Sequence, residues 1–176
     1  MKFAVFFVMF FLFLICFTTA QTLIQDSCKK AAAKDPLFKY DFCVKSLETD
    51  PHSKAATNLK GLLIASTKNT ESNTINVGTE IRTILMDKKA SHGIEIPLRD
   101  CIKLYTDGKD YLNQALKNVK SSDYRSASVH LSAALDAPTT CETGFKETIH
   151  KKSPVAKENK ALFQKILIPL AFSNMI

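Results

Sequence analysis

Cysteine is the residue type in this sequence with the most scope for chemistry. Of the five cysteines in 176 residues, Cys16 lies in an apolar amino-terminal run, and the other four are Cys28, Cys43, Cys101 and Cys141. No C-x-x-C or H-x-x-x-H spacing accompanies them, so we expect neither a zinc site nor a dithiol redox site. An even set in a secreted chain indicates two disulfides. Spacing leaves three pairings open, and we favour neighbours in sequence, Cys28 with Cys43 and Cys101 with Cys141.

The other side chains that could catalyse a reaction are scattered. Serines occur without a G-x-S-x-G elbow, and glycines without the spacing of a phosphate-binding loop. Paired carboxylates such as Asp41 and Glu48 fall on helix faces, where a solvated surface explains them. The four histidines are equally dispersed: His52, His92, His130 and His150. We therefore expect no enzyme activity, no catalytic residues, no cofactor and no metal.

The amino-terminal run has the pattern of a secretory signal peptide. Fifteen consecutive apolar residues, Phe3 to Phe17, follow Lys2 and precede Thr18-Thr19-Ala20. A basic start, an apolar run and small residues before a cleavage point define such signals, so we expect residues 1–20 to be removed. A membrane span needs about 20 apolar residues, which makes a retained anchor the weaker alternative. Residues 21–176 then form one secreted domain that does not interact with a membrane.

Basic residues outnumber acidic ones without forming a block. The formal net charge is +7, and it falls to +6 once Lys2 is removed with the signal. Lysines cluster only as pairs, at 29–30, 88–89 and 151–152. A nucleic-acid binder concentrates its charge along one stripe, so we expect no nucleic-acid partner. The charge permits association with acidic polymers or with an enzyme cleft lined by carboxylates.

Helical spacing dominates the chain from residue 21 onward, and strand signals are nearly absent. We expect two short helices within 21–50, the first ending before Asp35-Pro36. A long helix follows over about 51–89, with a polar middle at 67–74 where two joined helices are the alternative. Asp50-Pro51 is a cap followed by proline at the first helical position, and His92-Gly93 is the expected stop.

Three further helices complete the pattern. The next covers about 98–119, and Ser121-Ser122-Asp123 forms a short connection with good capping residues. Another starts at Tyr124 and is kinked or interrupted at Pro138, and the last covers about 155–170 with a bend at Pro169. We predict an all-α fold: an antiparallel up-and-down four-helix bundle (51–176) preceded by an α-helical hairpin (21–50), with two disulfides. A monomer is favoured.

Several sequence runs resemble the plant invertase and pectin methylesterase inhibitor family over about residues 22–174. They are the four cysteines in order with Ile24 and Leu47, Asp100-Cys101 with Tyr105, and Leu131-Ser132-Ala133-Ala134-Leu135 with Thr140-Cys141 and Gly144-Phe145. Runs such as 40–47 and 153–159 are most similar to a pollen allergen in the invertase-inhibitor branch. The resemblance implies a helical hairpin before a four-helix bundle, and disulfides joining the first cysteine to the second and the third to the fourth. It also implies a non-catalytic protein of the cell wall or vacuole that blocks its target enzyme through a protein–protein interface.

The resemblance implies a partner-binding site at Ser122, Asp123 and Tyr124. In the family's invertase inhibitors, a Pro-Lys-Phe tripeptide at this connection enters the target's active-site cleft. Tyr124 could replace the aromatic anchor, because tyrosine is a common interface hot spot. Asp123 replaces the lysine, and catalytic carboxylates would repel it. The alternative is structural: Ser122 or Asp123 caps the helix and Tyr124 packs in the core.

We therefore expect a secreted inhibitor of plant acid invertase that occludes the enzyme's cleft. The first alternative is a pectin methylesterase inhibitor that covers its target with exposed faces of the bundle helices. The second is a secreted pollen allergen that has the same fold and inhibits neither enzyme.

Overall fold

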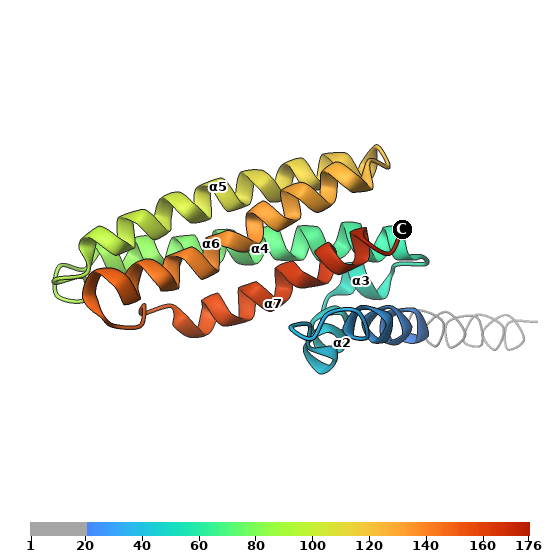
Figure 1. Ribbon diagram of the computed structural model, residues 1–176, viewed down its shortest axis with the longest axis horizontal. Helices are drawn as coiled ribbons and strands as arrows, with labels where there is room; N and C mark the ends of the chain where they lie inside the picture. Colours follow the sequence, from blue (N-terminus) through green and yellow to red (C-terminus); the bar gives the residue numbers. More distant parts are fainter. Residues whose placement is uncertain (1–20) are drawn as a thin grey trace, which may run out of the picture.

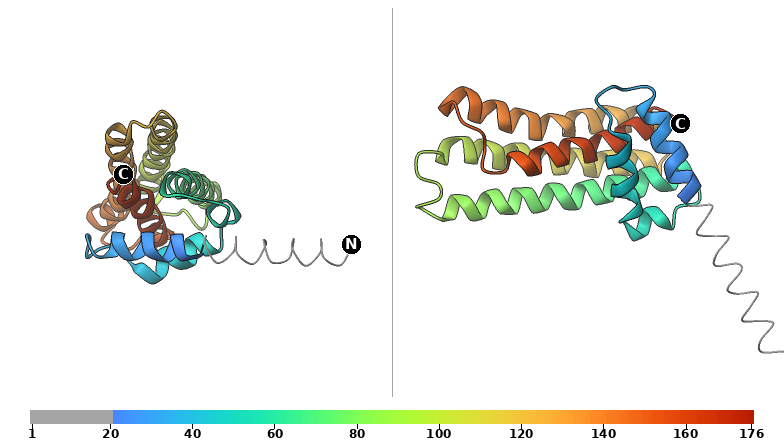
Figure 2. Two further views of the ribbon diagram at one scale, coloured as in Figure 1. Left: turned by 90° about the vertical axis from the view of Figure 1, so that its right-hand side faces the viewer. Right: turned by 90° about the horizontal axis from the view of Figure 1, so that it is seen from below.

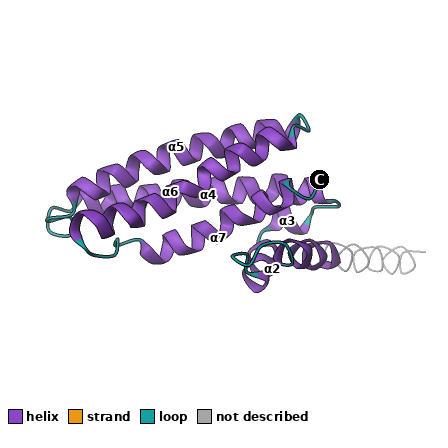
Figure 3. Ribbon diagram, in the orientation of Figure 1, coloured by secondary structure: helices purple, strands orange, loops and turns teal. Residues whose placement is uncertain are grey.

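Four long helices form the main body of the computed structural model, which describes residues 21–176 (Figure 1). The expected signal peptide, 1–20, lies outside the described residues. Residues 21–32 are helical, and the helices that follow are α2 (Tyr40–Glu48), α3 (Pro51–Lys54), α4 (Leu59–Met86), α5 (Glu95–Lys120), α6 (Tyr124–Ile149) and α7 (Ala156–Ser173). The described part of the chain contains no strand (Figure 3).

Helices α4 to α7 run alternately up and down and pack around one core (Figure 2). Each helix contributes fully buried apolar side chains to this core, among them Leu62, Leu112, Leu131, Phe145 and Leu162. The helical segment 21–32 and α2 form a hairpin beside one end of the bundle (Figure 1). The predicted fold class, a four-helix bundle behind a helical hairpin, is confirmed.

Both disulfides pair cysteines that are neighbours in sequence order. Cys28–Cys43 joins the segment 21–32 to α2, and Cys101–Cys141 joins α5 to α6 with 4.9 Å between their Cα atoms. Helices α5 and α6 also approach closely at Gly108, where a Cβ atom would lie 3.2 Å from Ala137 Cβ. A side chain at position 108 would therefore press on Ala137, and the two helices would have to give by a few tenths of an ångström.

The polar middle of α4 is part of one continuous helix, because the hydroxyl groups of its threonines find hydrogen-bond acceptors on backbone carbonyls. Thr67, Thr70 and Thr74 are buried. Thr67 and Thr74 donate to backbone carbonyls four residues earlier, and Thr70 donates to the carbonyl of Lys165 in α7. A joint between two helices at 67–74, the alternative left open, is therefore wrong.

The expected ends of this long helix are also wrong. Asp50 does cap a helix that starts at Pro51, accepting from Ser53 N at 2.8 Å, but that helix, α3, ends at Lys54. Helix α4 starts only at Leu59, after Asn58 accepts from Gly61 N and forms a second cap. It ends at Met86, where the Asp87 carboxylate accepts from two following backbone N–H groups. Gly93, at φ 77°, precedes α5 and does not end α4.

Pro138 does not interrupt α6, which is continuous from Tyr124 to Ile149. Proline has no N–H to donate to the carbonyl four residues earlier, that of Ala134. This loss of one hydrogen bond is tolerated inside a helix that packs on α5 and α7. Of the two expected effects of Pro138, the interruption is therefore wrong, and the kink stays a prediction.

One side chain of α7 holds the turn of the hairpin. The buried amide of Gln164 accepts from Lys39 N at 3.1 Å and donates to Leu37 O at 2.9 Å. Phe38, between these two residues, is buried in the core. The hairpin is thus docked on the bundle by a two-point hydrogen bond and an apolar anchor.

Candidate functional site

The connection between α5 and α6 brings the three predicted partner-binding residues together at one end of the bundle (Figure 1). Ser122 is exposed and adopts a positive φ of 63°. Its hydroxyl oxygen accepts a hydrogen bond from Lys60 Nζ at 2.8 Å, and Lys60 also reaches the carbonyl of Lys120. Ser122 is therefore tied to the first turn of α4.

Asp123 is the N-cap of α6. Its carboxylate accepts from Ser126 N at 3.1 Å. Hydrogen bonds from the Ser126 side chain and backbone hold the pKa of the Asp123 carboxyl below its usual value. The group therefore remains negative in mildly acidic surroundings, where it would repel the carboxylates of an enzyme cleft.

Tyr124 is the first residue of α6 and packs, half-buried, against the core. Each of the three residues in the connection thus contributes to the fold, Ser122 through its contact to α4, Asp123 as a helix cap and Tyr124 through apolar packing. Capping by Asp123 is the structural alternative expected from the sequence. Binding of a partner by these residues stays a prediction.

A second candidate surface is a groove of about 310 Å³ between α4 and α5. Its floor consists of the buried residues Thr74, Gly78 and Tyr105. Arg82 of α4 and Lys109 of α5 contribute two cationic groups to its lining. The periodicity of the two helices contained a signal for this groove, because Gly78 and Arg82, like Tyr105 and Lys109, are four residues apart and share a helix face.

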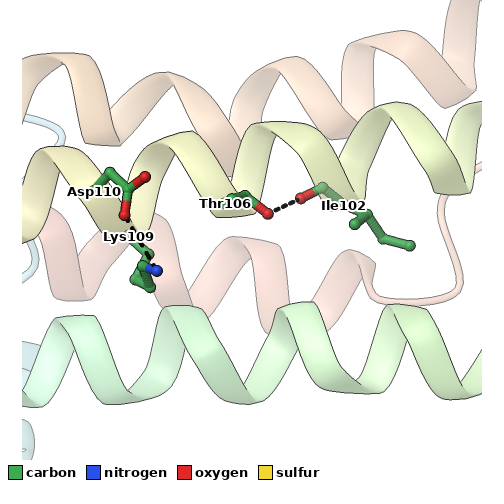
Figure 4. A network of polar contacts seen from close by, with 4 residues as sticks. All are labelled: Ile102, Thr106, Lys109 and Asp110. Atoms are coloured by element: carbon green, nitrogen blue, oxygen red, sulfur yellow. Dashed lines mark hydrogen bonds and ion pairs between the residues drawn. The ribbon is translucent and has the colours of Figure 1, made fainter.

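Figure 4 shows the α5 side of this groove, with Lys109 extending toward α4. Lys109 Nζ lies 3.1 Å from the Asp110 carboxylate. The Thr106 hydroxyl donates to the carbonyl of Ile102 at 2.8 Å, so its proton is already used (Figure 4). On the α4 side, Ile75 exposes 45% of its surface.

The floor of the groove is fixed by a buried hydrogen-bond network. The Tyr105 hydroxyl donates to Asn159 Oδ1 in α7, and the Asn159 amide donates to Glu142 in α6. Glu142 also accepts from the hydroxyl of Ser153. Burial, together with the charges of Glu142 and Glu158, raises the pKa of the Tyr105 phenol, which therefore stays a neutral donor.

The described residues hold no cluster of three or more histidine, cysteine or acidic side chains that could bind a metal. Between residues 21 and 176, no helix has the length and apolar character of a membrane span. The geometry within this part of the chain is that of a rigid bundle that presents surface grooves.

Comparison with known proteins identifies the relatives of this chain. A family model described as plant invertase/pectin methylesterase inhibitor matches residues 22–172. Pectinesterase inhibitor 12 of Arabidopsis thaliana is 53% identical over 176 residues, which cover all of both chains. The protein named "Putative invertase inhibitor" of Platanus orientalis is 41% identical over 165 residues, 92% of this chain and 94% of that protein.

Solved structures agree with these relatives. A crystal structure of a mutant form of a pectin methylesterase inhibitor from Arabidopsis superposes with a TM-score of 0.66 at 25% identity, covering 78% of this chain and 89% of the other. The sequence runs favoured the invertase-inhibitor branch, but this chain is more similar to the Arabidopsis pectinesterase inhibitor than to the Platanus protein.

Proposed function

The chain belongs to the plant invertase/pectin methylesterase inhibitor family, and from this membership we propose that it inhibits a plant pectin methylesterase, also called a pectinesterase. The observation that carries the proposal is the 53% identity to pectinesterase inhibitor 12, which extends over the whole of both chains. Because the family consists of inhibitors, the chain is not an enzyme.

The α5–α6 connection adds support for this choice of target. Entry into an acidic cleft would need an accessible cation at the centre of the tripeptide, and Asp123 places a capped, negative carboxylate there. Ser122 and Tyr124 are held by Lys60 and by the core. A mechanism that uses helix faces needs none of these three residues.

In the proposed mechanism, exposed faces of the bundle cover the active-site region of the enzyme. A stable complex of this kind buries about 800 Å² on each partner, which one face of two adjacent long helices can supply. The Cys101–Cys141 disulfide and the Tyr105–Asn159 contact hold α5, α6 and α7 in fixed positions. Little conformational entropy is then lost on binding, which favours affinity.

We also propose that the protein acts outside the cell, in the plant cell wall, with the vacuole as the alternative. The run at residues 1–20 has the pattern of an export signal, and both disulfides require an oxidising compartment. Expression of the full chain in plant cells, with the protein recovered from wall fluid and its first residue determined, tests this step. Retention inside the cytosol would contradict it.

The test of function is a titration of a plant pectin methylesterase with the purified secreted protein near pH 5, with release of methanol as the measurement. We expect activity to fall to near zero as the inhibitor approaches one equivalent. Full activity at a large excess of inhibitor would contradict the proposal.

Inhibition of acid invertase is the second candidate function, favoured by the 41% identity to the Platanus protein. In this case Ser122, Asp123 and Tyr124 would contact the target. Hydrolysis of sucrose by a cell-wall invertase, measured with the same protein preparation, separates the two candidates. If neither enzyme were inhibited, a non-inhibitory pollen protein with this fold would be the remaining interpretation.

A further inference from the structure

The α4–α5 groove contains a guanidinium group, that of Arg82, for which the described residues provide no partner. Arg82 forms no ion pair and no side-chain hydrogen bond with any residue between 21 and 176, although Glu80 and Asp87 are close to it in sequence. Its Nη1 atom lies 3.6 Å from the position that a Cβ atom would occupy at Gly78. The guanidinium is therefore folded over Gly78 at the edge of the groove.

From this arrangement we propose that Arg82 and Lys109 together bind a carboxylate side chain of the target enzyme. The inference rests on the proposed function and adds the surface and the chemistry of contact. Arginine binds a carboxylate through two parallel N–H donors, and a lysine ammonium on the opposite side adds a second positive charge. The two residues come from different helices, so an acidic group between them contacts both α4 and α5.

The rest of the groove favours this occupant over a cation or a neutral polar group. The Thr74 hydroxyl donates to its own helix, the Thr106 hydroxyl donates to Ile102, and the Tyr105 hydroxyl donates to Asn159. Among the described residues of the lining, the only side chains left with free N–H donors are Arg82 and Lys109. Ile75 adds an exposed apolar contact, so the expected occupant is an acidic residue next to an apolar one.

One acidic group, Asp110, lies next to this pair of cations. Asp110 contacts Lys109, whereas Glu71, one turn before Ile75 on α4, is about three turns from Arg82 and is not part of the groove lining. The Lys109–Asp110 pair is largely exposed, with 38% and 65% of the side chains accessible, and an exposed pair of adjacent residues is weak. Lys109 can therefore turn to an incoming carboxylate, while Arg82 needs no rearrangement.

The first experiment compares two double variants as inhibitors of the same pectin methylesterase. Arg82→Ala with Lys109→Ala removes both cations from the groove. Lys152→Ala with Lys160→Ala is the matched control, because it removes two positive charges from the groove between α6 and α7. We expect the inhibition constant to rise by about tenfold or more for the first variant and to change by less than about threefold for the control.

A second pair of variants tests the charge without removing either cation. Thr106→Glu places a carboxylate in the groove that competes with the enzyme's acidic residue, and Thr106→Gln adds the same bulk without charge. We expect Thr106→Glu to weaken inhibition more than Thr106→Gln does. Circular dichroism and thermal unfolding check that all four variants retain the wild-type fold.

The outcomes separate the two proposals. If the wild-type protein leaves pectin methylesterase fully active, the proposed function fails. If the wild type inhibits but the groove variant and its matched control behave alike, the function stands and the carboxylate site is overturned. Binding of polygalacturonate that depends on Arg82 and Lys109, with inhibition unchanged in their double variant, would also overturn it, because the occupant would be a polysaccharide.

Discussion

The hydroxyl of Tyr105 on α5 donates a hydrogen bond to the side-chain carbonyl of Asn159 on α7 inside the bundle. Only 2% of each residue is exposed. Through Asn159 the contact extends to Glu142 on α6, and Tyr105 also forms the floor of the α4–α5 groove. One tyrosine therefore links the packing of the core to the surface that we propose binds the enzyme.

Replacing Tyr105 by phenylalanine should lower the free energy of unfolding by about 1–3 kcal/mol, because a buried carbonyl oxygen on Asn159 loses its donor. Urea unfolding of the two proteins measures the difference. Tyr111→Phe is the control, since Tyr111 is 40% exposed and should change stability by less than about 0.5 kcal/mol. Equal stability of Tyr105→Phe and the wild type would contradict the role of this contact.

Tyr105 should also make the protein less stable in alkali. Burial raises the pKa of this phenol above its ordinary value of 10.0, so the native state keeps a proton that the unfolded chain releases. The unfolded state then binds fewer protons, and stability falls as pH rises above 10, by up to about 1.4 kcal/mol per pH unit for one group. Unfolding between pH 9 and 11 should show a steeper decline for the wild type than for Tyr105→Phe. Parallel declines would contradict this assignment.

Two glycines should respond oppositely to substitution by alanine. At Gly78 in α4, a Cβ atom would meet Tyr105 Cβ at 3.5 Å, an ordinary contact, so Gly78→Ala should gain about 0.5–1 kcal/mol from helix propensity. At Gly108 in α5, the Cβ would lie 3.2 Å from Ala137 Cβ, and α5 and α6 would have to separate. Thermal unfolding should therefore show a higher Tm for Gly78→Ala and a lower one for Gly108→Ala. Stabilisation by both changes would show that the α5–α6 contact can relax.

The two disulfides should contribute unequally to stability. Cys101 and Cys141 are 40 residues apart, and Cys28 and Cys43 are 15 apart. The chain-entropy model assigns about 4 kcal/mol to the longer loop and about 3 kcal/mol to the shorter one. Denaturant unfolding of the two paired Cys→Ala variants measures this order. A larger loss on removal of the hairpin disulfide would mean that packing in the native state, and not loop length, decides the ranking.

Asp123 should stabilise α6 only while its carboxyl is ionised. Its pKa in the folded protein lies below the unfolded value because of the Ser126 hydrogen bonds, so the stabilisation is present above the unfolded pKa and is lost as pH falls through the folded one. The difference in Tm between the wild type and Asp123→Ala should therefore shrink when the pH is lowered from 6 to 2. Inhibition of pectin methylesterase should be unaffected by this substitution. A large loss of inhibition would indicate that the α5–α6 connection contacts the enzyme.

Much of the fold could be predicted from residue spacing, because helix faces with apolar residues three and four apart specify a bundle. The helix boundaries could not. Ala55 and Ala56 are good helix formers, yet helix α3 ends at Lys54, and Asn58 caps the next helix, α4. Pro138 signalled a break that packing on two neighbouring helices prevents. At Pro138 the packing of neighbouring helices decided the outcome, and a local pattern does not contain it. At Lys54 the new start is set by the local cap in which Asn58 accepts from Gly61 N, which competes with the helix propensity of the two alanines.

Each candidate site likewise has a part that the sequence predicts and a part that depends on the packing of the helices. The α5–α6 connection could be located from its capping residues, but the contact of Ser122 with Lys60 joins residues 62 apart in sequence. The α4–α5 groove depends on Gly78 facing Tyr105, a register between two helices that neither helix specifies alone. Spacing revealed the shared face on each helix, and only the three-dimensional packing brings Arg82 and Lys109 to one groove.

The central claim is that this helical bundle blocks a pectin methylesterase. Its most direct test is a side-by-side titration of one preparation against a pectin methylesterase and an acid invertase, with size-exclusion chromatography of each mixture. We predict loss of ester hydrolysis together with a co-eluting one-to-one complex, while the invertase keeps its activity. Blocked invertase beside a fully active, uncomplexed methylesterase would contradict the account.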